Sequence, residues 1–133
     1  MSAITVKLNA DFEKSEELLK KELAKVGFGI LTKIDVADTL KKKIDVDFEP
    51  LVILGACNPK FAHKALSYDI DLSLLLPCNI TLSKGNDTSY TVVKAVDPRE
   101  LLGDTTKDDT LKQLADDAYN ALEEALHNAQ QCC

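Results

Sequence analysis

The chain has 133 residues, and its 22 acidic and 16 basic side chains give a formal net charge of −6 at pH 7. This acidic balance argues against a nucleic-acid partner, whose phosphates require a basic surface. Aromatic residues make up only 5% of the chain and tryptophan is absent, so few side chains could stack on bases.

Hydrophobic residues make up 45% of the chain, which suits a single globular domain over residues 1–133. No apolar run approaches the ~20 residues that a membrane helix needs, and the N-terminus lacks the segments of a signal peptide. We therefore expect a cytoplasmic protein with no membrane partner. The four cysteines should be reduced in that compartment.

The first elements are marked by alternation and by helix caps. Apolar and polar residues alternate over residues 4–8, which predicts a half-buried strand. Asp11 is a good N-cap and Gly27 a good C-terminal glycine for a helix over 12–26. A second alternating segment over 28–34 predicts the next strand.

Asp35 can then cap a short helix with an apolar stripe formed by Val36, Leu40 and Ile44. The lysines at 41–43 are expected to face solvent. Residues 51–56 are apolar on both faces, as is typical of a central strand.

The third helix is expected to begin at Asn58-Pro59, with asparagine as N-cap and proline as the first helical residue. Alternation predicts strands over 78–83 and 91–95, joined by a hairpin turn at 84–87. A polar loop over 103–107 precedes the clearest helix of the chain, at about 108–129.

This last helix carries an apolar face formed by Leu111, Leu114, Ala115, Ala118, Leu122, Ala125, Leu126 and Ala129. We expect it to be a main cover of the core. The element order is β-α-β-α-β-α-β-β-α, which predicts an α+β fold with a mixed or antiparallel sheet of about five strands. The helices should pack on one face of that sheet.

Two Cys-Asn steps are the strongest candidates for a functional site. Cys57-Asn58 ends one apolar run, and Cys78-Asn79 begins the next strand. Antiparallel pairing of successive strands would bring Cys57 and Cys78 close together at one corner of the sheet. Since the helix at Pro59 begins at the same corner, its free amides could favour an anion or a thiolate there.

Several interpretations of these residues stay open. Cys57 could be a reactive thiol with His63 as its base, or either cysteine could be a small buried hydrophobic residue. Asn58 could contact a ligand or serve only as the helix cap. Asn79 has no obvious structural task, and His63 could equally be a solvated surface residue. Cys132-Cys133 could capture a soft metal or belong to a frayed tail.

Short motifs in a fixed order add a family resemblance. They lie at residues 27–36, 39–41, 54–59, 62–66, 75–79 and 96–98. Together they resemble the domain of unknown function family 302 over most of residues 1–98. The resemblance implies a small α+β domain of TATA-binding-protein-like arrangement, β-α-β(4)-α, and a homodimer, but no established activity or cofactor.

The sequence therefore favours a dimeric binding or regulatory module with a pocket near Cys57, Asn58, His63, Cys78 and Asn79. Small molecules, a metal ion and haem all remain admissible ligands. The alternatives are a thiol-dependent enzyme or redox protein that uses Cys57, and a purely structural dimeric partner protein.

Overall fold

The computed structural model describes residues 2–85, 89–103 and 108–131. Its strands are β1 (Ala3–Leu8), β2 (Gly29–Asp35), β3 (Leu51–Cys57), β4 (Cys78–Lys84) and β5 (Thr91–Val96). Its α-helices are α1 (Phe12–Lys25), α2 (Val36–Ile44), α3 (Pro59–Tyr68) and α4 (Asp109–Gln131). A 3-10 helix, η1 (Ile70–Leu75), and a π-helical turn, η2 (Arg99–Gly103), complete the elements.

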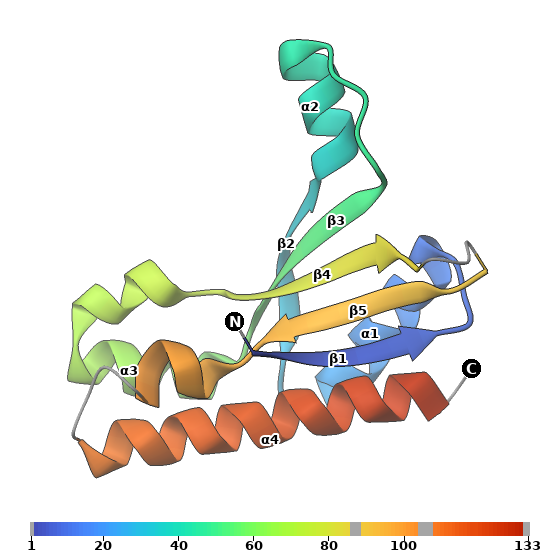
Figure 1. Cartoon of the computed structure of the whole chain (residues 1–133). Coiled ribbons are helices and arrows are strands. Elements are labelled where there is room, and N and C mark those ends of the chain that lie inside the picture. The colour runs from blue at the N-terminus through green and yellow to red at the C-terminus, as the bar shows by residue number, and fades with distance from the viewer. Residues whose placement is uncertain (1, 86–88, 104–107, 132–133) are drawn as a thin grey trace.

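The five strands form one sheet in the order β1-β5-β4-β3-β2, and every neighbouring pair is antiparallel (Figure 1). The α+β class and the predicted element order are thereby confirmed, with the antiparallel alternative realised. The polar loop expected at 103–107 and the hairpin turn expected at 84–87 lie partly outside the described residues, as do Cys132 and Cys133.

Local chemistry explains where the helices begin. The Asp11 carboxylate accepts a hydrogen bond of 2.8 Å from the Lys14 amide, as an N-cap of α1 should. The Asp35 carboxylate accepts one of 3.0 Å from the Asp38 amide at the start of α2. Gly27 ends the α1 segment at a φ of 84°, a conformation that glycine adopts without steric cost.

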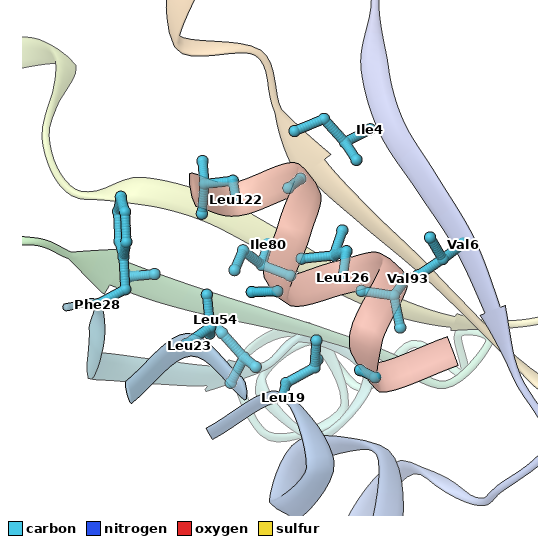
Figure 2. Packing of buried hydrophobic residues seen from close by; sticks show 14 of the residues in the cluster. Ile4, Val6, Leu19, Leu23, Phe28, Leu54, Ile80, Val93, Leu122 and Leu126 are labelled. Carbon is cyan, nitrogen blue, oxygen red and sulfur yellow. The ribbon is translucent and has the colours of Figure 1, made fainter. Parts of the chain in front are cut away.

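The core lies between one face of the sheet and helices α1 and α4 (Figure 2). Alternate strand residues point into it, and Leu54, Ile80 and Leu82 are completely buried. The eight apolar residues predicted for the last helix are all buried in α4. Its expected role as a main cover of the core is therefore confirmed.

The other face of the sheet is more polar. Thr5, Thr81 and Lys94 lie side by side on it, because Lys94 pairs with Thr5 of β1 on one side and with Thr81 of β4 on the other. Thr5 and Lys94 are exposed, and Thr81 is half-buried. We call this the open face.

A projecting region, residues 36–50, begins where the edge strand β2 ends and includes α2 (Figure 1). We call it the arm. No residue of α2 is buried. The arm carries three exposed large apolar side chains: Ile44 (63% exposed), Val46 (43%) and Phe48 (52%). Leu31 (67%) and Ile34 (48%) are exposed on β2, the edge strand that leads to it. Ion pairs from Lys41 to Asp45 and Asp47, and from Lys42 to Asp38, line its polar side.

Among the residues that the structure describes, no helix is both long enough and apolar enough to cross a bilayer.

Candidate functional site

The two Cys-Asn steps are adjacent in the sheet. Cys78 pairs with Ala56 across β3 and β4, so it lies one residue from Cys57 in the register. Both cysteines are free and both line one small cavity. The proximity predicted from antiparallel pairing is therefore present.

This cysteine cavity is small and apolar. Its volume is about 40 Å³, and its walls include Phe28, Phe61, Leu76 and Leu114. A water molecule occupies about 30 Å³ of liquid, so a space of this size holds little more than one water. The corner where the cysteines meet has no room for an organic ligand or haem in this conformation.

The two thiols differ in their environment. Burial raises the pKa of the Cys78 thiol to about 11, and the nearby Cys57 contributes a smaller shift in the same direction. Cys78 is therefore a neutral thiol at physiological pH and packs as a small hydrophobic residue. Cys57 is only half-buried, at the end of β3.

Asn58 has a structural task. Its Oδ1 accepts hydrogen bonds from the amides of Lys60 (3.0 Å) and Phe61 (3.2 Å), which caps α3. Its Nδ2 donates to the Val26 carbonyl oxygen at 3.4 Å. A Cβ on Gly27 would lie only 2.9 Å from that Nδ2, so Gly27 and Asn58 fit together as a pair. Both polar atoms of the Asn58 side chain are thus hydrogen-bonded to backbone groups.

Asn79 faces a different and larger space. It points to the open face and lines a pocket of about 540 Å³ that we call the leucine pocket. The lining residues are Ala3, Leu74, Leu75, Leu76, Pro77, Asn79, Thr81, Lys94, Ala95, Val96 and Leu101. Leu76 lines both this pocket and the cysteine cavity, so the two spaces approach each other at this residue.

Pro77 lies close against the sheet where β3 has a glycine. A Cβ on Gly55 would meet the Thr32 hydroxyl and would lie 2.7 Å from Pro77 Cγ. Gly55 also pairs directly with Asn79. The glycine therefore allows the segment before β4 to fold over the open face and form a wall of the leucine pocket.

His63 lines neither space. It is exposed on α3 and borders a groove of about 750 Å³ between α3 and the start of α4. The groove also contains Lys64, Tyr68, Asp109, Leu111 and Asp117. The structure places His63 in this groove and Cys57 in the cysteine cavity, so the two residues line different spaces.

A hydrogen bond joins the two helices at one end of this groove. The Tyr68 hydroxyl donates to Asp108 Oδ2 at 2.8 Å. This bond lowers the pKa of the Asp108 carboxyl, and the amides of Thr110 and Leu111 lower it further. The contact fixes α3 to the start of α4.

Within the parts of the chain that the structure describes, no three or more His, Cys, Asp or Glu side chains are grouped as a metal site would require. The Cys132-Cys133 pair lies outside those parts.

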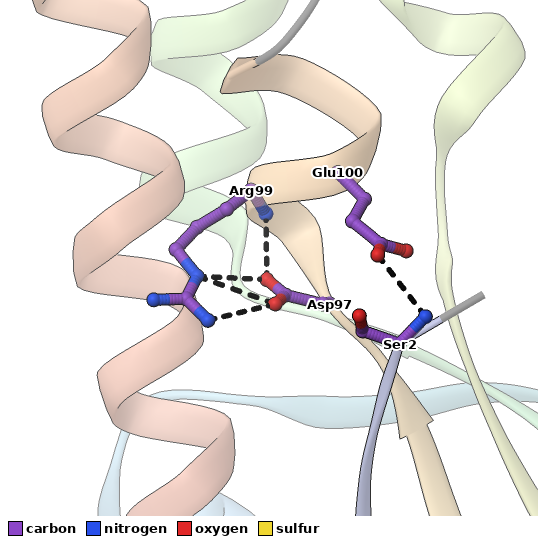
Figure 3. Close-up of polar contacts among 4 residues, drawn as sticks. All are labelled: Ser2, Asp97, Arg99 and Glu100. Carbon is purple, nitrogen blue, oxygen red and sulfur yellow. Dashed lines mark hydrogen bonds and ion pairs between the residues drawn. The ribbon is translucent and has the colours of Figure 1, made fainter.

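A polar cluster formed by Asp97 and Arg99 follows β5. The sequence predicted only the end of a strand there. Arg99 binds the buried Asp97 through Nε (3.0 Å) and Nη2 (2.8 Å), as Figure 3 shows. The bond with Arg99 lowers the pKa of Asp97 despite its burial. The guanidinium also lies 3.6 Å from the centre of the Tyr119 ring on α4. Asp97 and Arg99 therefore fasten the end of β5 to α4.

The fold and these sites define a small α+β domain with a five-stranded antiparallel sheet. A family model described as "Domain of unknown function DUF302" matches residues 4–129. The chain belongs to this family. The match includes most of α4, which lies beyond the motifs that carry the resemblance in the sequence.

A solved structure supports the same conclusion. The chain is similar to an uncharacterized conserved DUF302 protein from Bacillus stearothermophilus, with 30% sequence identity and a TM-score of 0.86. The alignment covers 97% of this chain and 98% of the other. No curated protein matches the chain.

Proposed function

We propose that the protein is a binding module that holds a small organic molecule in the leucine pocket, beside the second Cys-Asn step. The size and lining of this pocket carry the proposal. Ligand sites usually have volumes of ~300–1,000 Å³, mostly apolar walls and a few polar groups. The leucine pocket has about 540 Å³, with Asn79, Thr81 and Lys94 as its polar side chains.

The donor groups favour an organic ligand over a metal ion or haem. The described residues that line the pocket offer an amide, a hydroxyl and an ammonium group, but neither an imidazole nor a thiol. Soft metals and haem iron are usually held by those missing groups. The cysteines line a separate cavity and not this pocket.

The proposal can be tested by blocking the pocket. We expect Thr81→Phe to fill the floor of the pocket and abolish binding of small molecules, detected by native mass spectrometry and by amide shifts in NMR spectra. Gln113→Phe places the same bulk in the groove between α3 and α4, and it should leave binding intact. Cooperative unfolding of both variants would show that they are folded. Binding that survives Thr81→Phe and disappears in Gln113→Phe would contradict the proposal.

We further propose that the protein is a homodimer that associates through the arm. The exposed apolar side chains of the arm, Ile44, Val46 and Phe48, support this proposal, because a second copy of the chain could remove them from water. Helix α2 has no buried residue of its own, so a second copy would provide the cover that it lacks.

Analytical ultracentrifugation tests this assembly. The wild-type chain should sediment as a dimer at micromolar concentration, and Ile44→Asp should sediment as a monomer. Leu74→Asp is the matched control, since Leu74 is 85% exposed but lies outside the arm. A monomeric wild-type protein would refute the dimer. A dimer that tolerates Ile44→Asp but not Leu74→Asp would place the interface elsewhere.

A further inference from the structure

Lys94 holds an unusual position on the open face. It lies on β5, which has β1 on one side and β4 on the other. Its direct neighbours across the sheet are the neutral hydroxyl residues Thr5 and Thr81. Asn79 follows on the same face of β4, two residues before Thr81. Lys94 is therefore surrounded by groups that can donate hydrogen bonds.

Among the described residues, no carboxylate forms an ion pair with Lys94. The two carboxylates closest in sequence have other partners. Asp97 is bound by Arg99, and Glu100 Oε1 accepts a hydrogen bond of 3.0 Å from the Ser2 amide (Figure 3). In a chain with a net charge of −6, this pocket thus contains an unpaired cation.

The rest of the pocket is apolar. Lys94 is the only charged residue among the described residues that line it. The walls come from the leucines at 74–76, Pro77, Val96 and Leu101. A ligand that matches this lining needs an apolar body of several carbon atoms and one negatively charged group.

We infer that the leucine pocket binds an amphipathic carboxylate, an apolar molecule with a single carboxylate group, and that Lys94 is the residue that selects the anion. This inference rests on the proposed binding function and names its ligand class. A carboxylate is an acceptor-only group, so it can accept hydrogen bonds from the ammonium of Lys94, the Thr81 hydroxyl and the Asn79 amide together. A single ammonium group suits one negative charge better than the double charge of a phosphate monoester, for which arginine clusters are usual.

The inference predicts a ranking among three probes with the same ten-carbon chain. Decanoate should bind more tightly than decanol, and decylamine should bind least, as measured by isothermal titration calorimetry at neutral pH. Because Lys94 is exposed to solvent, we expect decanoate to exceed decanol by about fivefold rather than by orders of magnitude. Salt should weaken the binding of decanoate and leave that of decanol unchanged.

Two variants isolate the charge. Lys94→Gln should make decanoate and decanol bind equally, while decanol retains its wild-type affinity. Lys112→Gln removes the same charge from an exposed site on α4, away from the pocket, and should preserve the preference for decanoate.

The outcomes separate this inference from the proposed function. Equal binding of decanoate and decanol to the wild-type protein, lost in Thr81→Phe, would overturn the choice of anion and leave the pocket as the binding site. A preference for decanoate that survives Lys94→Gln would overturn the role of Lys94. If none of the three probes binds, the ligand class is wrong, and the search for bound small molecules decides separately whether the pocket is used.

Discussion

Helices α2 and α4 both carry an apolar stripe in the sequence, but the structure treats them in opposite ways. All eight residues of the α4 stripe are buried, most of them against the sheet and α1, and Leu111 and Leu114 in a second cluster with Ala65 of α3, while no residue of α2 is buried. Helix α4 has 23 residues, and most of its apolar stripe packs on the apolar face of the five-stranded antiparallel sheet. Helix α2 has only nine residues and lies in the arm, where the chain offers little to cover its stripe. Periodicity thus reveals a face that needs cover, without revealing what covers it.

The largest test of this comparison removes α4. A chain truncated before Leu111 loses the buried residues Leu111, Leu114, Leu122 and Leu126. At ~2–3 kcal/mol for each fully buried leucine, the loss is comparable to the whole stability of ~5–15 kcal/mol that a domain has. We expect no cooperative thermal transition in circular dichroism. A truncated chain that melts like the full chain would show that α4 is dispensable.

Single substitutions sharpen the contrast between the two helices. Leu122→Ala creates a cavity at a fully buried site of α4 and should lower the free energy of unfolding by ~2–5 kcal/mol. Ile44→Ala, on the exposed side of α2, should change it by less than ~0.5 kcal/mol. Urea unfolding at low protein concentration, where association does not contribute, measures both. Equal losses would mean that the arm is part of the cooperative core.

The Asp97–Arg99 pair offers a pH-dependent test of how α4 is held. The pKa of Asp97 is lowered in the folded protein, so the carboxylate stabilises the fold above the ordinary aspartate value of 3.8. That contribution is lost as the pH falls through the lowered pKa. Asp97→Asn should therefore reduce the melting temperature at pH 7, and the difference from wild type should shrink in strong acid. Glu124→Gln, at an exposed position of α4, should show no such pH-dependent difference.

The smallest expected effect concerns the two neighbouring thiols. They differ in how far the protein covers them, because Cys78 is buried and Cys57 is half-buried. In a Cys132→Ser, Cys133→Ser background, iodoacetamide at pH 8 should label Cys57 and leave Cys78 unmodified, because the pKa of Cys78 is raised to about 11 by burial. Peptide mass spectrometry gives the order of labelling. Cys57→Ser should abolish the labelling and Cys78→Ser should not. Faster labelling of Cys78 would contradict its assigned burial.

Much of the fold could be predicted because each boundary has a local chemical signal. Asp11 and Asn58 cap α1 and α3 where expected, and the apolar face of α4 matches its buried residues. Antiparallel pairing also placed Cys57 near Cys78. These features depend on short-range rules: capping, periodicity and the pairing of successive strands.

The features that the sequence left open or missed depend on long-range packing. His63 lines the groove beside α4, whereas Cys57 lines the cysteine cavity. The wall of the leucine pocket comes from residues 74–77, for which the sequence predicted no element. Leu74 is 85% exposed. The only sequence signal of this pocket wall was the run of leucines before Pro77, and such a run does not distinguish a core segment from the wall of a pocket.

Leu76 is shared by two spaces of very different size. It lines both the cavity of about 40 Å³ beside Cys78 and the pocket of about 540 Å³ on the open face. A shorter side chain at this position would widen the cavity beside the Cys78 thiol. Leu76→Ala is therefore the substitution to choose for giving the protein a thiol handle near its pocket, to which a covalent probe or a fluorophore could be attached.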